Sequence, residues 1–299
     1  MAHTEGCSTV DGYVFSRLYD TKKLETRAVD GFKFRPEDVV VAGFPKSGNT
    51  WLVEVLKAMY TNWGLVEVSD TKCPIFLEEY TLYKRYLGKI RQQVVETTNL
   101  EDLPSPRLIQ THLPATVFPC HVLKDNGVKV IHMSRNPKDV VVSMYYFWNK
   151  FMHGQFSTGN WDQTVQAFVE DRLPLTPWIR HVGDWFQRGI EDNVLHVTYE
   201  EMTQDLPAII RKVADFLRRP RTDEAIGKVV RTTSVGEMRN RLSKMIIADE
   251  EMIPKNENPF VRKGIVGDWK NHFTVAQSEL FDAAIGVKTK NINRNIPYQ

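Results

Sequence analysis

The segment 39–51 contains residues whose types and spacing could hold an anion. A run of valines leading to Gly43 is typical of a buried strand, Gly48 follows five positions later, and Thr50 stands two positions beyond it. This is the GxxxxGxT spacing of a P-loop, in which backbone N–H groups converge on an anion at the N-terminus of a helix. The segment therefore predicts a turn that binds phosphate or sulfate.

The charge of this turn differs from that of a nucleotide triphosphatase. Asn49 stands where such enzymes carry the lysine that reaches the β- and γ-phosphates, and the lysine of the turn, Lys46, lies three residues earlier. A nucleotide kinase or triphosphatase also needs a carboxylate after a neighbouring strand to hold Mg²⁺, for which Glu200 and Glu201 are the candidates. This class is the first alternative function.

A histidine stands at the end of another predicted strand. His112 follows the segment 107–111 and precedes Leu113 and Pro114. An imidazole, with an unperturbed pKa of about 6.5, suits a general base. The histidines show no HxxxH or HExxH spacing, so we expect a base here and no metal site.

Two groups of cations are candidate phosphate sites. Arg135 lies in the turn before a predicted helix that begins at Pro137, and a guanidinium can bind phosphate oxygens in bidentate fashion. Arg262 and Lys263 stand beside Gly264, a residue that lets the backbone approach an anion closely. Each group places positive charge next to a turn.

The chemistry-bearing residues follow strands of one predicted α/β fold. The predicted strands are 39–43, 107–111, 129–134 and 193–198, and the predicted helices are 49–60, 137–151, 177–188 and 205–217. This alternation predicts a central parallel β-sheet flanked by helices, with ligands beyond the carboxyl ends of the strands. We expect a single domain over 1–299, with residues 1–12 flexible and a mostly helical final third. The extended stretch 253–266 is either a lid or binding loop or a surface connection.

Composition excludes several classes of protein. The 299 residues carry a net charge of +2 with dispersed cations, which argues against a nucleic-acid partner. The three cysteines, Cys7, Cys73 and Cys120, are too far apart for paired zinc-ligand spacing or a disulfide framework and suggest a reducing compartment. The sequence shows neither an apolar leader nor a long apolar window, so we expect a cytoplasmic protein without a membrane segment.

The phrases around these residues resemble those of the cytosolic sulfotransferases. They are FPKSGNTW at 44–51, THLP at 111–114, RNPKD at 135–139 with Ser143 eight residues after the arginine, and RKGIVGDWK at 262–270. The matches run in the expected order from Phe44 to Glu279. The resemblance implies transfer of a sulfuryl group from PAPS (3′-phosphoadenosine-5′-phosphosulfate) to a hydroxyl, or an amine, of a small acceptor by direct in-line displacement without a metal.

The resemblance also implies roles for individual residues. His112 would be the base, Lys46 would stabilise charge on the bridging oxygen of the departing nucleotide, and Ser143 would hold Lys46 aside until the acceptor binds. Residues that would bind PAPS are Lys46, Ser47, Gly48, Asn49, Thr50, Trp51, Arg135, Ser143, Tyr199, Thr233, Ser234, Val235, Met238, Phe260, Arg262, Lys263 and Gly264. Val235 replaces the phenylalanine of the family's TSF phrase.

The acceptor and the assembly are implied in the same way. Phe76, Gln110, His112 and Phe147 would line the acceptor pocket, whose aromatic character favours a phenol. Gln110 stands where the family commonly has a lysine, so a protein that binds PAPS or its product without turnover is the second alternative. A KxxxTVxxxE phrase made by Lys270, Thr274, Val275 and Glu279 resembles the family's dimerisation signature and implies a homodimer.

Overall fold

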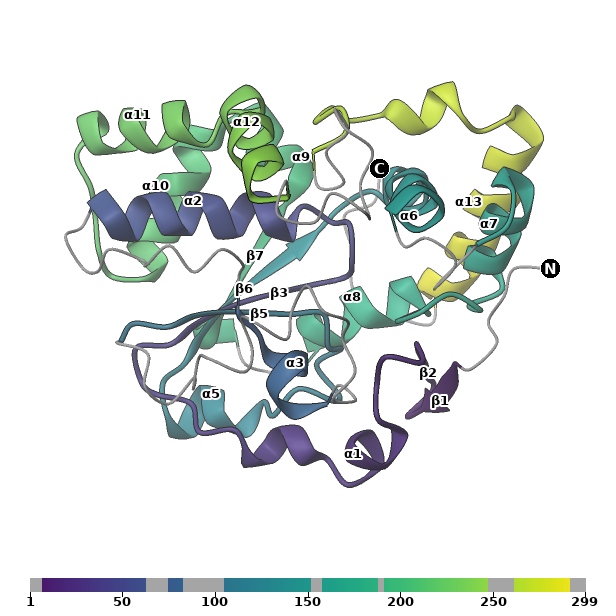
Figure 1. Cartoon of the computed structure of the whole chain (residues 1–299), viewed down its shortest axis with the longest axis horizontal. Coiled ribbons are helices and arrows are strands. Elements are labelled where there is room, and N and C mark those ends of the chain that lie inside the picture. The colour runs from purple at the N-terminus through teal and green to yellow at the C-terminus, as the bar shows by residue number, and fades with distance from the viewer. Residues whose placement is uncertain are drawn as a thin grey trace.

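A five-stranded sheet, parallel throughout, forms the centre of the molecule. The computed structural model describes residues 7–62, 75–82, 105–151, 158–187, 191–246 and 261–290. The strand order is β4–β5–β3–β6–β7 (Figure 1). Their bounds are Ile75–Phe76 for β4, Leu108–Thr111 for β5, Val39–Gly43 for β3, Lys129–Ser134 for β6 and Val194–Thr198 for β7. The predicted α/β fold with a central parallel sheet flanked by helices is confirmed.

One face of the sheet is covered by α2 (Asn49–Asn62), α10 (Leu206–Phe216) and α11 (Asp223–Thr232) (Figure 1). Apolar residues of these helices pack against alternate strand residues such as Val41 and Ile131. Residues of β3 are buried throughout, as expected for a parallel strand that is covered on both faces.

The opposite face carries a larger apolar cluster. It includes residues of α5 (His121–Asp125), α6 (Pro137–Phe151), α7 (Trp161–Val169), α8 (Trp178–Gln187), α13 (Val275–Lys290) and an N-terminal hairpin of β1 (Ser8–Val10) and β2 (Tyr13–Phe15). The hairpin begins at Ser8, within the N-terminal segment for which we expected flexibility. Its two strands are antiparallel and pair over three positions.

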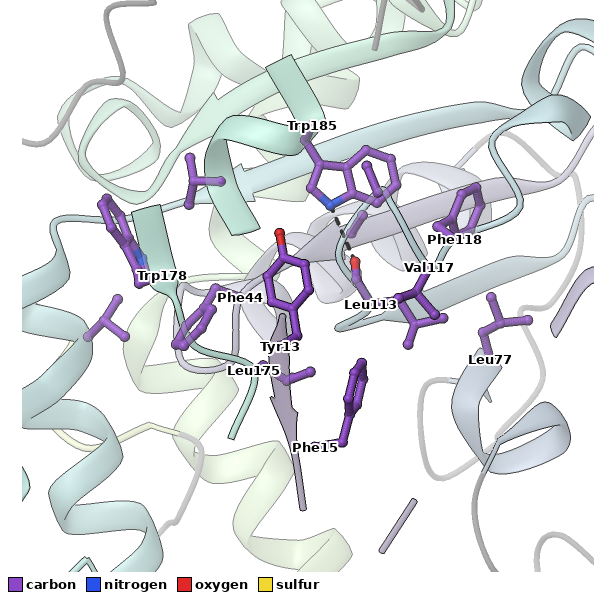
Figure 2. Close-up of a cluster of buried hydrophobic side chains, with 14 of the residues drawn as sticks. Tyr13, Phe15, Phe44, Leu77, Leu113, Val117, Phe118, Leu175, Trp178 and Trp185 are labelled. Carbon is purple, nitrogen blue, oxygen red and sulfur yellow. Dashed lines mark hydrogen bonds between the residues drawn. The ribbon is translucent and has the colours of Figure 1, made fainter. Parts of the chain in front are cut away.

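Figure 2 shows how this cluster anchors the chain just beyond two strand ends. Phe44 follows β3, and Leu113 follows the residue after β5; both side chains are fully buried. The Trp185 indole donates a hydrogen bond to the Leu113 carbonyl at 3.3 Å (Figure 2). Large buried side chains therefore fix the backbone just beyond the ends of β3 and β5.

Helix bounds agree closely with the predicted ranges. α6 has the predicted bounds, α2 continues two residues further, and α8 and α10 are one residue shorter at each end. Asp205 is excluded from α10 because it is the N-cap, with its side chain accepting from the Ala208 N–H at 3.0 Å.

The remaining helical elements are short connections and the helices of the final third. They are α1 (Thr21–Glu25), α3 (Leu77–Thr81), α9 (Tyr199–Gln204), α12 (Val235–Ile246) and 3₁₀ turns over Ala28–Gly31, Glu191–Asn193 and Asp268–Asn271. Within the described ranges no helix has both the length and the apolar character needed to span a membrane.

Candidate functional site

The turn between β3 and α2 has the backbone of a cradle. Lys46 and Gly48 both have positive φ, 67° and 107°. A Cβ on Gly48 would lie 2.7 Å from side-chain carbons of Met133 and Tyr199, so only glycine fits there. The Ser47 hydroxyl is buried and has no hydrogen-bond partner in the part of the chain that the structure describes. The turn thus presents helix N–H groups and a buried hydroxyl.

Asn49 closes this turn rather than extending from it. Its side chain is buried, and its amide Nδ2 donates to the Phe44 carbonyl at 3.0 Å and more weakly to the Gly43 carbonyl at 3.4 Å. The predicted contact of Asn49 with the donor can therefore come from its main chain, because its side-chain amide is used to brace the turn. Thr50, in the first turn of α2, is partly exposed.

Lys46 reaches from the turn to α6. Its ammonium lies 3.9 Å from the centroid of the Phe147 ring. Burial, together with the nearby positive charges of Arg135 and Arg262, lowers the pKa of Lys46 from 10.5 to about 7. Ser143 lies one helical turn before Phe147 on α6 and is partly buried. A lysine with such a pKa can change its charge at neutral pH.

His112 is held at three atoms by three different elements. Its ring Nδ1 lies 2.7 Å from the Gly43 carbonyl oxygen, its main-chain N–H donates to Glu78 at 2.5 Å, and its carbonyl accepts from His181 Nε2 at 2.9 Å. Because a carbonyl oxygen only accepts, Nδ1 carries the proton and Nε2 carries the lone pair. The tautomer required of a base is therefore set by Gly43.

Phe76, Gln110 and His112 lie on one face of the sheet. Phe76 on β4 is paired with Gln110 on β5, and His112 follows Gln110 by two positions. The rings of Phe76 and His112 are 5.5 Å apart. Gln110 is buried, and its Oε1 has no hydrogen-bond partner among the described residues. Three of the four predicted acceptor residues are thereby adjacent.

The predicted purine-binding residues cluster beside the turn. The Trp51 indole donates to the Thr233 carbonyl at 3.0 Å, and the Trp51 ring meets the Tyr199 ring edge-on at 5.5 Å. Met238 is buried on α12, whereas Ser234 is exposed and accepts from the N–H of Glu237. The structure thus brings together Trp51, Tyr199 and Thr233. The Ser234 side chain instead binds a main-chain N–H at the start of α12.

Arg135 is at the centre of the candidate nucleotide site. Its guanidinium lies 4.1 Å from the centroid of the Tyr199 ring and donates to the carbonyls of Lys46 and Ile265 at 3.4 and 3.3 Å. Its Nε is buried and has no hydrogen-bond partner within the described residues. One cation therefore connects the turn, α9 and the loop that carries Arg262.

In the loop that carries Arg262, two cationic side chains pair with one buried carboxylate. Arg262 and Lys263 donate to Asp268 at 2.6 and 2.7 Å. Burial would raise the pKa of Asp268, but hydrogen bonds from Lys263, Asn271 and Arg262 outweigh it and hold that pKa well below its usual range. Because Asp268 offsets one of the two charges, the pair presents about one net positive charge.

The same loop is fixed at two further points. Gly264 has φ of 76°, and a Cβ there would lie 2.9 Å from the methyl groups of Val235. Val235 therefore packs against the backbone of the RKG phrase, and its contact with the adenine stays a prediction. Asp139, at the start of α6, accepts from the N–H groups of Gly267 and Trp269 at 2.7 and 2.9 Å. Phe260 lies outside the described residues.

Four residues that support the site were not predicted from the sequence. Asp139 and Asp268 belong to the quoted RNPKD and RKGIVGDWK phrases, and an acidic residue inside a cationic phrase was the available signal. Glu78 and His181 gave no signal, because they are 34 and 69 residues from His112 along the chain. No group of three potential metal ligands occurs among the described residues.

The predicted dimer segment lies on the surface. Lys270, Thr274, Val275 and Glu279 are exposed, with 75% of Val275 accessible. The Thr274 hydroxyl accepts from the Gln277 N–H at 3.2 Å and so caps α13. An apolar side chain at a helix start is thus available for contact.

Comparison with known proteins identifies the family. Residues 36–293 match the Sulfotransferase domain family. The chain is 35% identical over 258 residues to human Sulfotransferase 1E1, covering 85% of this chain and 84% of that protein. It is 36% identical over 257 residues to Sulfotransferase 1A1 of Rattus norvegicus, covering 85% of each.

A solved structure gives the same result. Mouse sulfotransferase SULT7A1 complexed with PAP superimposes with a TM-score of 0.73 at 28% identity, over 96% of this chain and 95% of that one. These matches argue against the nucleotide-kinase alternative, which rested on the turn alone. The chain belongs to the sulfotransferase family of enzymes.

Proposed function

We propose that this chain transfers the sulfuryl group of PAPS to a hydroxyl, or an amine, of a small and preferably phenolic acceptor. The observation that carries this proposal is the hydrogen bond between His112 and Gly43. Gly43 opens the anion-binding turn, so the candidate base is fixed to the same residue from which the donor site begins. When one segment of backbone positions both the base and the group to be transferred, the two are already oriented for reaction.

The residues around the turn fit the donor. The Ser47 hydroxyl and the Arg135 Nε are buried polar atoms without a partner in the described residues, and anionic oxygens would satisfy both. The 5′ end would lie on the turn with Ser47 and Thr50, and the 3′-phosphate would contact Arg135, Arg262 and Lys263. PAPS in this position supplies the sulfuryl group and a nucleotide leaving group. The solved complex of SULT7A1 with PAP supports this choice of nucleotide.

Two residues would handle protons and charge. His112, with its lone pair on Nε2, would take the proton of the acceptor hydroxyl. Lys46, whose pKa is lowered to about 7, would stabilise the charge that develops on the departing oxygen. Ser143, one helical turn before Phe147 on α6, would contact the 3′-phosphate, as the family resemblance implies.

The acceptor would bind beside Phe76, Gln110 and Phe147. Aromatic rings at two of these positions favour a flat acceptor, and His112 selects its hydroxyl. We further propose that the enzyme works in the cytoplasm, as cytosolic sulfotransferases do, and pairs as a homodimer through the segment around Val275.

Measurement of kcat/KM with PAPS and four acceptors tests this function. We expect p-nitrophenol and dopamine to be sulfated more efficiently than a hydroxysteroid or a monosaccharide, with activity unaffected by EDTA. The matched control is His112→Ala, which removes the base. A clear preference for the steroid or sugar would overturn the phenol assignment.

The second candidate function is binding of PAPS or PAP without turnover. It is favoured by Gln110 and Val235, which replace residues common in the family. Tight binding of PAP with no sulfation of any of the four acceptors would support this candidate and contradict the transferase proposal.

A further inference from the structure

Two side chains of α8 bind consecutive carbonyls just beyond the end of β5. His181 Nε2 lies 2.9 Å from the His112 carbonyl oxygen, and Trp185 Nε1 donates to the Leu113 carbonyl at 3.3 Å (Figure 2). His181 and Trp185 are four residues apart on α8, so they lie on the same side of the helix, one turn apart. Both side chains are buried. One face of α8 therefore holds the two peptide groups that follow the candidate base.

His181 acts in this contact as a neutral donor. Because a carbonyl oxygen only accepts, Nε2 of His181 carries the proton. Burial lowers the pKa of His181 from 6.5 to about 4, although its hydrogen bond to the His112 carbonyl acts in the opposite direction. The ring is therefore uncharged at neutral pH. It fixes the His112 backbone without adding a positive charge beside the base.

The N-terminal hairpin braces the same part of α8. The Tyr13 hydroxyl, on β2, donates to the Asp184 carboxylate at 2.7 Å, and the Tyr13 ring meets the His181 ring edge-on at 6.3 Å. The Arg180 guanidinium lies 4.6 Å from the centroid of the Tyr13 ring and donates to the Asp11 carbonyl at 2.8 Å. The hairpin thus contacts α8 on both sides of His181 in the sequence, which fixes the position of the donor.

The position of the His112 ring depends on both ends of its own backbone. The ring keeps its lone pair on Nε2 only while Nδ1 donates to the Gly43 carbonyl, 2.7 Å away. The His112 N–H is bound from α3, so the carbonyl is the other end that must be held. We propose that His181 and Trp185 are positioning residues, whose paired hydrogen bonds fix the backbone after β5 and so keep the His112 ring in the tautomer of a base. This inference rests on the proposed function and gives α8 a role in it.

Nuclear magnetic resonance of the full chain, labelled with ¹⁵N-histidine, can read the His112 tautomer. Spectra are recorded at about pH 8, where an imidazole of ordinary pKa is neutral, and the His112 signal is identified by its loss in His112→Ala. We expect the Nδ1–H tautomer in the wild type. His181→Phe keeps a ring but removes the donor, and should give a mixture of both tautomers. His181→Gln keeps an N–H donor on its side chain and should retain most of the wild-type signal.

Turnover and nucleotide binding give the second measurement. In His181→Phe, kcat should fall about ten-fold while the affinity for PAP stays within about two-fold of wild type, because the backbone of the base is released and the anion-binding turn is not. In His181→Gln, kcat should stay within about three-fold of wild type. If His181→Phe does not fold, Trp185→Phe removes the other donor and is judged by the same two readings.

Val182→Ala is the matched control. Val182 is buried on α8, so this change opens a cavity in the same helix and leaves the His181 donor in place. It should lower the free energy of unfolding in urea without changing kcat or the His112 tautomer.

Each outcome decides the proposal. An unchanged His112 tautomer in His181→Phe, an Nε2–H tautomer in the wild type, or equal losses of kcat in His181→Phe and Val182→Ala would overturn it. A tautomer that changes as expected, in a protein that sulfates none of the four acceptors, would refute the proposed function and leave the positioning role in place.

Discussion

Glu78 and His112 are joined by a 2.5 Å hydrogen bond from the histidine main-chain N–H to a carboxylate that is fully buried. The same carboxylate oxygen accepts from the Thr111 hydroxyl at 3.1 Å. A buried carboxylate that accepts from a main-chain N–H and from the hydroxyl of the preceding residue is a strong constraint on the backbone. The position of the candidate base therefore depends on α3, a helix of one and a half turns.

Glu78→Gln should weaken this constraint without changing the size of the side chain. Loss of a charge-assisted hydrogen bond costs on the order of 1.5–3 kcal/mol, so urea unfolding should show a lower free energy of unfolding. Because the His112 backbone is also affected, kcat should fall more than the affinity for PAP. A variant with unchanged stability and unchanged kcat would show that Glu78 does not constrain His112.

His112→Ala should abolish most turnover. Loss of a general base usually reduces the rate by about two to four orders of magnitude. The Asn49 side chain also binds the Gly43 and Phe44 carbonyls, so the turn should keep its shape without the His112 ring and calorimetry should show nearly unchanged PAP binding. Retention of more than a tenth of the wild-type kcat, equivalent to about 1.4 kcal/mol or less in the barrier, would contradict the assignment of the base.

The nucleotide site should distinguish a 3′-phosphate from a 3′-hydroxyl. Arg135, Arg262 and Lys263 lie where such a group would bind, so adenosine 3′,5′-bisphosphate should bind far more tightly than AMP in calorimetry. Arg262→Ala should remove most of this difference and leave AMP binding nearly unchanged. Equal affinity of the wild type for the two nucleotides would refute the 3′ site.

Val275→Glu should convert a dimer into monomers. Val275 is 75% exposed at the start of α13, and a buried charge in a self-complementary contact is unfavourable. Light scattering should report half the wild-type mass, with unchanged thermal unfolding of the protomer as the control for folding. An unchanged mass would leave this segment with the capping role of Thr274 alone.

Stability should decline between pH 6.5 and 4.5 because two histidines are buried as neutral groups. Burial lowers the pKa of His181 to about 4, and burial together with His196 lowers the pKa of His132 well below 6.5. The unfolded chain then binds more protons than the folded one, so falling pH favours unfolding, by roughly 3 kcal/mol for His181 at pH 4.

Urea unfolding at several pH values checks this expectation. His132→Phe keeps an aromatic ring beside Trp185, against which His132 stacks with centroids 5.7 Å apart. It should make the free energy of unfolding less dependent on pH in this window. An identical pH dependence in the variant and the wild type would show that His132 does not contribute.

The strands were predicted accurately where burial on both faces of the sheet requires a long run of apolar residues in the sequence. β3 and β6 have their predicted bounds, while β4, with two residues, is too short to show any period. The hairpin of β1 and β2 was missed for the same reason, since its strands have three residues each.

The site was predictable where its residues are close in sequence. The turn, Arg135 and the RKG phrase are local patterns, and the structure places them around a common centre. The contact of Lys46 with Phe147 and that of Glu78 with His112 depend on how separate elements pack, and no local pattern encodes such packing. Val235 shows the same limit, because its contact with Gly264 brings together residues 29 positions apart.

Asp139 gives α6 an influence on both substrates. Its carboxylate accepts hydrogen bonds from the main-chain N–H groups of Gly267 and Trp269, so the loop that carries Arg262 is attached to the N-terminus of α6. Phe147 lies on the same helix, two turns later. Any redesign that tilts or lengthens α6 would disturb nucleotide recognition together with acceptor fit. Phe76 lies on β4 with its ring 5.5 Å from that of His112, so a substitution there would change the candidate acceptor site without moving α6.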